Sequence, residues 1–110
     1  MSKKHEKDIE ENIEDILQSK EKTFVLFYAS WCPFSQAFLP IYDRYFQKDP
    51  QTFHHVIIDD KEELMDRYSV DVTPTVILFE NGGIKRRCDG EAGIGLTEKR
   101  LLEIIYSSRE

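Results

Sequence analysis

Cys32 is the residue of this sequence whose surroundings point most directly to chemistry. A run of strand-forming residues at 23–28 leads to it, and a helical pattern of apolar side chains follows from Phe34. At the start of a helix, unpaired backbone N–H groups and the positive end of the helix dipole both favour an anion. We therefore expect the thiol of Cys32 to ionise more readily than a free cysteine, and its thiolate to act as a nucleophile.

Ser35 stands where the usual second cysteine of a redox pair would lie, so the sequence predicts chemistry by a single thiol. One turn along the helix, the Ser35 hydroxyl is placed either to hydrogen-bond the sulfur or simply to be a helix N-terminal residue. The alternative for Cys32 is a buried core cysteine. Its position before Pro33 at a helix start favours the reactive interpretation.

Cys88 is the second candidate thiol. A cysteine near the end of a strand is more often a small hydrophobic residue than a functional group. The neighbouring Lys85, Arg86 and Arg87 favour a lowered pKa, which keeps a second thiol as an alternative. To resolve a disulfide at Cys32, it would have to come within bonding distance of that sulfur or of a trapped substrate.

Two further pairs resemble catalytic or metal-binding sets. His54 and His55 are adjacent on a predicted strand and so point to opposite faces, and we predict no metal site. Asp59 and Asp60 could suggest paired carboxylates. Asp60 is better explained as the N-cap of a short helix, with Glu63 reaching back in a capping box, and Asp59 as the end of a strand near the reactive cysteine.

The composition limits the class of protein. Of 110 residues, 40% are hydrophobic and 12% aromatic, enough for a single globular domain over residues 1–110. The net charge of −6 argues against a nucleic-acid partner, because a phosphate backbone would be repelled. No apolar run approaches the roughly 18–20 residues of a membrane span, and residues 1–8 lack the apolar core of a signal peptide. We expect a cytoplasmic monomer with free thiols.

Hydrophobic periodicity and turn residues predict alternating helices and strands. The predicted helices cover 6–19, a stretch from the Cys32 motif through Pro40 to about 47, a short stretch from Asp60, and a final segment capped by Thr97; the predicted strands cover 23–28, 53–58, 75–79 and 84–88. Asn81 and Gly82 suit a tight hairpin turn. The fold class is therefore α/β, with a mixed central sheet, parallel at its centre with a C-terminal antiparallel hairpin, and helices on both faces.

This order of elements, with Trp-Cys-Pro-Phe-Ser at residues 31–35 after the first core strand, resembles the thioredoxin family. The resemblance covers nearly the whole chain. It depends on four features taken together and in order: residues 27–32 at the strand-to-helix turn, Pro40 within the helix, residues 72–75 before an apolar strand, and residues 79–82 followed later by Gly90.

The resemblance implies a thioredoxin-like domain in which Pro74 is a cis-proline against the reactive cysteine, and Thr73 offers backbone hydrogen bonds to an extended substrate. Pro33 would hold the turn. Trp31 and the loop near Gly90 would form the apolar rim of a substrate groove. Two further residues depart from the family's pattern. Leu26 stands where the family commonly has a buried acidic residue, and His55 stands where a lysine is often found near that acid.

The predicted function is monothiol thiol–disulfide exchange in redox homeostasis. Cys32 would attack a client protein disulfide or a glutathione adduct and form a mixed disulfide. Release would need an outside thiol such as glutathione, a second client thiol, or Cys88. No cofactor is predicted beyond glutathione as a co-substrate.

Two alternatives belong to other classes. One is a binding module that holds a client without turnover. The other is a glutathione-dependent iron–sulfur scaffold, because Cys-Pro-Phe-Ser at residues 32–35 also resembles the motif of monothiol glutaredoxins.

Overall fold

The computed structural model describes Ile13, Leu17 and residues 21–107. In chain order its elements are β1 (Lys22–Tyr28), α2 (Pro33–Lys48), β2 (Phe53–Ile57), α3 (Glu62–Arg67), β3 (Thr75–Glu80), β4 (Gly83–Asp89) and α4 (Glu98–Ser107). The helix predicted over residues 6–19 falls almost entirely outside the described residues. Of that stretch, Ile13 and Leu17 are helical and buried.

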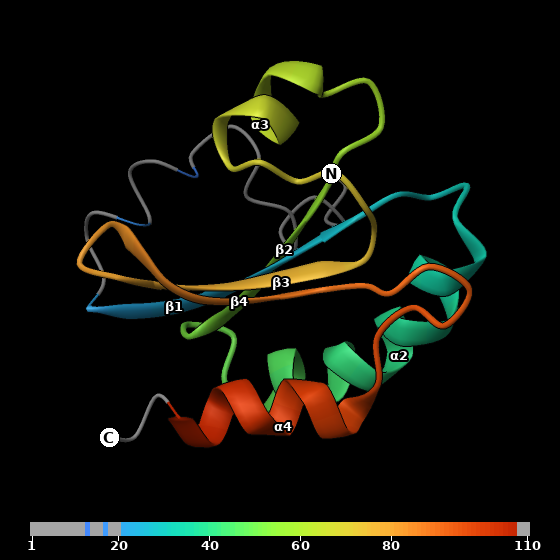
Figure 1. The fold of residues 1–110 in the computed structure, drawn as a ribbon. Helices are drawn as coiled ribbons and strands as arrows, with labels where there is room; N and C mark the ends of the chain where they lie inside the picture. Colours follow the sequence, from blue (N-terminus) through green and yellow to red (C-terminus); the bar gives the residue numbers. More distant parts are fainter. Residues whose placement is uncertain (1–12, 14–16, 18–20, 108–110) are drawn as a thin grey trace, which may run out of the picture.

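A four-stranded sheet forms the centre of the molecule, with the strands in the order β2-β1-β3-β4. β1 pairs with β2 in parallel, whereas β3 is antiparallel to both β1 and β4. Figure 1 shows α3 above the sheet and α2 and α4 below it. The predicted mixed sheet, its C-terminal hairpin and the helices on both faces are therefore confirmed.

β1 is buried on both faces because its side chains alternate between two hydrophobic clusters. Val25 and Phe27 belong to the cluster on the α3 side, together with Ile13 and Leu17. Phe24 and Leu26 belong to the cluster under α2 and α4. A strand that must fill both cores has no polar face, which explains the continuous apolar run in the sequence.

α2 is fixed against the sheet by a buried tyrosine. The Tyr42 hydroxyl lies 2.7 Å from the carbonyl oxygen of His54 and 3.1 Å from that of Phe24, so it bridges β1 and β2 from below. Pro40 lies within the helix, which continues past it to Lys48 as predicted. These contacts fix the second half of α2 against the sheet, and the helix begins just after the end of β1, at Cys32.

The hairpin between β3 and β4 turns as the sequence predicts. Asn81 has φ 54° and Gly82 has φ 90°, the positive values that a two-residue hairpin turn requires. β4 lies at the edge of the sheet, and its first residues are exposed. The strand is therefore polar on its outer side, which discourages pairing with another sheet.

The predicted capping box at Asp60 is wrong. α3 begins at Glu62, the residue before it is Lys61, and no side chain caps the helix N-terminus. Asp60 instead adopts φ 59° in a turn that the Lys61 N–H closes by donating to the Ile58 carbonyl at 2.9 Å. Aspartate tolerates the left-handed conformation better than most residues, so the same side chain suited a turn as well as a cap.

Candidate thiol site

Cys32 is the N-cap residue of α2. Its backbone is extended, with φ −91° and ψ 120°, and its carbonyl accepts the first helical hydrogen bond from the Gln36 N–H at 3.0 Å. Pro33 occupies the first helical position, where a residue without an N–H loses no hydrogen bond. The side chain of Cys32 is 7% exposed. The sulfur is thus placed at the positive end of the helix, as the sequence predicted.

The surroundings of Cys32 shift its pKa downward. Burial by itself raises the pKa of this thiol, but hydrogen bonds from Thr73, Ser35 and Phe34 together outweigh the burial and leave the pKa below its ordinary value. In the protonated form the Cys32 sulfur donates to the Thr73 carbonyl oxygen at 3.5 Å. Backbone N–H groups of the first helical turn are among these donors, so the start of α2 stabilises the thiolate directly.

Ser35 is completely buried beneath this turn. Its Oγ accepts a hydrogen bond from the Ala29 N–H at 3.2 Å, and its side chain also lowers the pKa of the Cys32 thiol by hydrogen bonding. The residue therefore joins the end of β1 to the start of α2. The sequence left open whether Ser35 hydrogen-bonds the sulfur or serves only as a helix N-terminal residue. In the structure its side chain both hydrogen-bonds the sulfur and bonds the backbone of the preceding turn.

The turn that presents Cys32 is fixed by Asp59, which the sequence placed near the reactive cysteine as the end of a strand, and by Gln36, which the sequence did not single out. The Ser30 N–H donates to Asp59 Oδ1 at 3.0 Å, and the Ser30 hydroxyl donates to Asp59 Oδ2. From the other side, Gln36 Nε2 donates to the Ser30 carbonyl at 2.7 Å. Asp59 follows β2, the parallel neighbour of β1, so the parallel pairing was the signal that could have brought it to this turn.

A groove of about 250 Å³ opens above Cys32. Large apolar side chains form much of its wall and are unusually exposed: Trp31 is 70%, Val72 41% and Phe34 36% exposed. The complete lining is Trp31, Cys32, Phe34, Ile58, Met65, Asp71, Val72, Thr73, Gly90, Glu91 and Ala92. Exposed apolar surface gathered around a concave site marks a place where a partner binds.

Thr73, Pro74 and Gly90 meet beside the sulfur. The peptide bond between Thr73 and Pro74 is cis. The Gly90 N–H donates to the Pro74 carbonyl at 2.9 Å, and a Cβ at Gly90 would lie only 2.8 Å from that same oxygen. Glycine is required here because of this close approach. Thr73 and Gly90 line the groove, Pro74 lies buried behind them, and the exposed Pro33 lies outside the lining.

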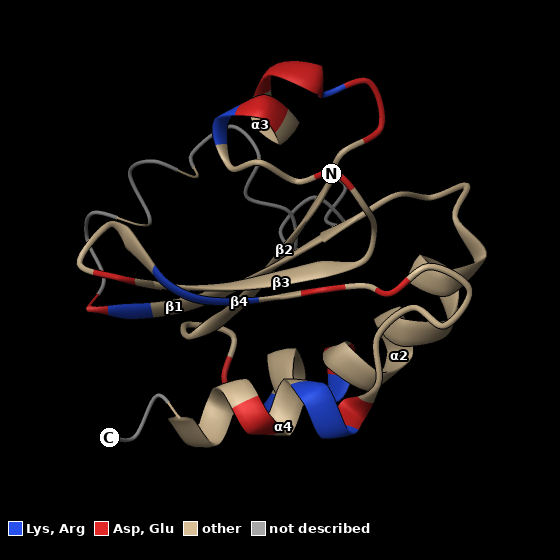
Figure 2. Ribbon diagram, viewed as in Figure 1, with Lys and Arg blue, Asp and Glu red and all other residues tan. Residues whose placement is uncertain are grey.

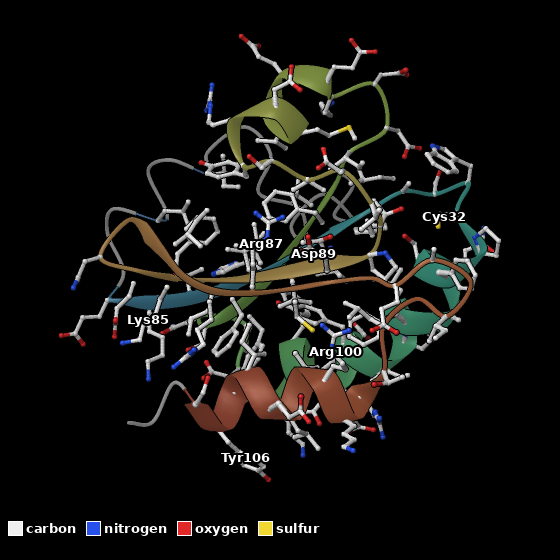
Figure 3. The ribbon with its side chains drawn as sticks, in the orientation of Figure 1. Cys32, Lys85, Arg87, Asp89, Arg100 and Tyr106 are labelled. Atoms are coloured by element: carbon white, nitrogen blue, oxygen red, sulfur yellow. The ribbon has the colours of Figure 1, made fainter. Side chains whose placement is uncertain are left out.

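The structure does not bring Cys88 together with Cys32. Cys32 belongs to the cluster on the α3 side of the sheet and Cys88 to the cluster under α2 and α4, and both are free thiols. Figure 3 shows Cys32 at one edge of the molecule, whereas Arg87 and Asp89, the residues on either side of Cys88 in β4, lie near its centre. Cys88 is 4% exposed and borders a separate cavity of about 240 Å³ with Arg100.

The lowered pKa suggested for Cys88 by its neighbours is wrong. Burial raises the pKa of this thiol, and Arg100 on α4 offsets only part of the effect. Two of the three basic neighbours bind other groups: Lys85 pairs with Glu80 at 3.0 Å, and Arg87 binds Asp89 and the carbonyl groups of Tyr68 and Ser69. Arg86 lines the same cavity as Cys88 but is not among the groups that lower its pKa. Alternation along β4 separates these side chains from a sulfur that points into the core.

Comparison with known proteins agrees with this geometry. The thioredoxin family model matches residues 3–103. The chain belongs to the thioredoxin family. Solved structures of thioredoxins have the same fold as this chain. Thioredoxin f2 of Chlamydomonas reinhardtii superimposes with a TM-score of 0.77 at 20% identity, covering 92% of each chain. Mitochondrial thioredoxin 3 of Saccharomyces cerevisiae gives a TM-score of 0.72, also at 20% identity, covering 92% of this chain and 91% of that one.

Curated relatives include two kinds of thioredoxin-family protein. Endoplasmic reticulum resident protein 44 of Mus musculus is 35% identical over 85 residues, which is 70% of this chain and 21% of that protein. Thioredoxin of Mycoplasmoides gallisepticum is 34% identical over 71 residues, 64% of this chain and 71% of that one. The chain therefore spans about a fifth of the length of the endoplasmic reticulum proteins it matches.

Within the described part of the chain, no three histidine, cysteine, aspartate or glutamate side chains are grouped as metal ligands. None of the helices in that part is both long and apolar enough to span a bilayer.

Proposed function

We propose that this protein performs monothiol thiol–disulfide exchange. The Cys32 thiolate attacks one sulfur of a client disulfide, the client S–S bond breaks, and a new S–S bond joins Cys32 to the client. The other client sulfur leaves as a thiolate and takes up a proton. Cys32 is oxidised to the mixed disulfide as the client disulfide is reduced. An external thiolate, with glutathione as the proposed co-substrate, then attacks the client sulfur of the mixed disulfide. The bond between Cys32 and the client breaks, an S–S bond between the client and glutathione forms, and Cys32 leaves as a thiolate.

The single observation that supports this proposal is the pair formed by Cys32 and Ser35. The sulfur has a lowered pKa at the start of α2, and the residue that contacts it from below is a buried hydroxyl. An oxygen cannot form the intramolecular disulfide that would expel a client. Leu26, fully buried at the position of the family's acid, also offers no proton carrier for a second thiol.

The groove provides the client site in this proposal. Its apolar wall suits an extended segment, and Thr73, whose carbonyl lies 3.5 Å from the Cys32 sulfur, would lie alongside the client backbone. Because Cys32 is only 7% exposed, a client must enter the groove to reach its sulfur.

The reaction is tested with an insulin-type protein disulfide. We expect poor turnover with a thioredoxin reductase and detectable turnover with glutathione. The matched variant Ser35→Cys should gain reductase-coupled activity, because it supplies the second sulfur on an intact scaffold. Strong reductase-coupled turnover by the unmodified protein would contradict the monothiol mechanism.

Client retention without turnover is the second candidate, favoured by the exposed apolar wall of the groove. A non-reducing pull-down separates the two. If complexes vanish in Cys32→Ala, the partner is held through the mixed disulfide. If they persist, the groove alone holds the partner.

Three narrower questions stay predictions. A colourless protein after anaerobic reconstitution with iron and sulfide would remove the iron–sulfur scaffold. Sedimentation analysis tests the predicted monomer. The cytoplasmic location is tested by imaging the tagged full-length chain, since one group of relatives is named for residence in the endoplasmic reticulum and another for the chloroplast.

A further inference from the structure

Two carboxylates line the same groove as the reactive sulfur. Asp71 lies two residues before Thr73, whose carbonyl is 3.5 Å from the Cys32 sulfur. Glu91 directly follows Gly90, whose N–H is bonded to Pro74. Both acids are exposed. Both residues line the groove that contains Cys32, so a client segment bound in this groove lies near them.

The backbone at Glu91 is held in place. The Glu91 N–H donates to the Gly95 carbonyl at 3.0 Å, and the Gly95 N–H returns a bond to the Glu91 carbonyl at 2.8 Å. Gly95 packs against the first turn of α2, because a Cβ there would lie 2.9 Å from Phe34 Cβ. The loop therefore fixes Glu91 relative to the helix that presents Cys32.

The groove has no opposing positive charge of its own. Among the described residues that line it, none is lysine, arginine or histidine. Arg100 on α4 forms an ion pair with Glu91 at 3.7 Å, which offsets part of the Glu91 charge, but Arg100 does not line the groove. A third carboxylate, Asp59, is bound to Ser30 next to Trp31.

The charge is also unevenly distributed over the molecule. Figure 2 shows mainly acidic residues on α3 and its flanking loops, with one basic residue at each end of the helix. Basic residues follow the middle of β4 and lie in the first turn of α4, after Glu98. The acidic groove is thus a local feature and does not simply repeat the net charge of −6. A groove lined by one sign of charge concentrates ligands of the opposite sign.

We infer that Asp71 and Glu91 select clients whose reacting cysteine is flanked by lysine or arginine within an otherwise apolar extended segment. This inference rests on the proposed exchange at Cys32 and names its substrate class. It also implies that anionic low-molecular-weight disulfides enter the groove less readily than cationic ones.

The test uses three symmetrical disulfides of similar size: cystamine, which is cationic, bis(2-hydroxyethyl) disulfide, which is neutral, and 3,3′-dithiodipropionate, which is anionic. Mass spectrometry follows the rate at which each forms an adduct on Cys32 at neutral pH. The ratio of the cationic to the anionic rate cancels the thiolate fraction of Cys32. Dividing it by the same ratio for a small neutral thiol, 2-mercaptoethanol, also removes the different intrinsic reactivity of the reagents, which depends on the pKa of the leaving thiol. The normalised ratio, used below, then reports the field around Cys32. At low ionic strength we expect a ratio of about tenfold, falling as salt is added.

The double variant Asp71→Asn with Glu91→Gln should bring that ratio close to one while leaving the neutral reagent's rate within about twofold, since only long-range attraction is removed. Glu103→Gln, an exposed α4 acid outside the groove, is the matched control and should keep the wild-type ratio. Two synthetic peptide disulfides that differ only in lysine or glutamate beside the cysteine should rank in the same order.

Each result of this test either supports or contradicts the proposed selectivity. A wild-type ratio near one, or a ratio that persists in the double variant, overturns the selectivity while reaction with the neutral reagent leaves the proposed exchange intact. Failure of Cys32 to react with any of the three reagents overturns both proposals.

Discussion

Two cysteines of this chain are almost equally buried and yet differ in chemistry. Cys32 is 7% exposed and its pKa is lowered, whereas Cys88 is 4% exposed and its pKa is raised. Burial opposes ionisation at both sites. What differs is the supply of hydrogen-bond donors: the start of α2 and Thr73 provide them to Cys32, while Cys88 projects from a strand whose backbone groups are directed along the sheet. Exposure alone would not distinguish a nucleophile from a core residue.

The largest effect is expected when each of the two cysteines is replaced in turn, which tests whether only Cys32 is reactive. Cys32→Ala should reduce mixed-disulfide formation by more than about a hundredfold, because no other activated thiol lines the groove. Cys88→Ala should leave the rate within about twofold. Adducts are counted by intact-protein mass spectrometry. Equal losses in the two variants would mean that Cys88 takes part in the exchange after all.

The pH dependence of alkylation separates the two thiols within one molecule. Because its pKa is lowered, Cys32 should ionise at a lower pH than an ordinary cysteine, and its iodoacetamide rate should stop rising at a lower pH. Cys88, with its raised pKa, should still be gaining reactivity at higher pH. Peptide mapping assigns each rate. A Cys32 profile like that of an ordinary cysteine would remove the case for thiolate chemistry.

Substitution at Gly90 tests the loop that packs against the cis-proline beside Cys32. Gly90→Ala places a methyl group 2.8 Å from the Pro74 carbonyl and should cost about 1–3 kcal/mol of stability, with slower client capture. Gly83→Ala is the matched control, since its nearest contact would be at 3.9 Å, and it should be nearly neutral. Urea denaturation measures both. Equal effects would show that close approach to the cis-proline is not the reason for the glycine.

The smallest expected effect is that of Ser35→Ala. Removing the hydroxyl takes away one hydrogen bond to the Cys32 sulfur and should raise the pKa of Cys32, slowing its alkylation at neutral pH by less than about tenfold. The Cys88 rate should not change. Because the variant also leaves the Ala29 N–H without its Ser35 partner, thermal unfolding is measured in parallel to identify a loss of structure.

Much of the scaffold could be predicted from local patterns. The apolar run at 23–28, the helix through Pro40 and the Asn81–Gly82 turn all agree with the structure, because each depends on neighbours within a few residues. The start of α3 could not be predicted as well. Asp60 suits both a cap and a left-handed turn, and the contact between Lys61 and Ile58 decided between them.

The candidate site also has one part that local sequence predicts and one part that it does not. The position of Cys32 before Pro33 at a helix start can be read from consecutive residues. The residues around the sulfur cannot be found in this way, because Thr73, Asp59 and Gly90 reach the sulfur, its turn or its groove from three different loops. The meeting of Asp71 and Glu91 in one groove likewise has no signature in the sequence, since 19 positions of chain separate them.

The sequence by itself determined that one thiol lies where a strand becomes a helix and that its customary partner is an oxygen. Local hydrogen bonding and hydrophobic periodicity are sufficient for that. Only the tertiary structure decided that Cys88 is withdrawn into the opposite core and that carboxylates face the groove. Those outcomes depend on which loops the sheet order brings together, and burial and electrostatic fields arise from such distant neighbours.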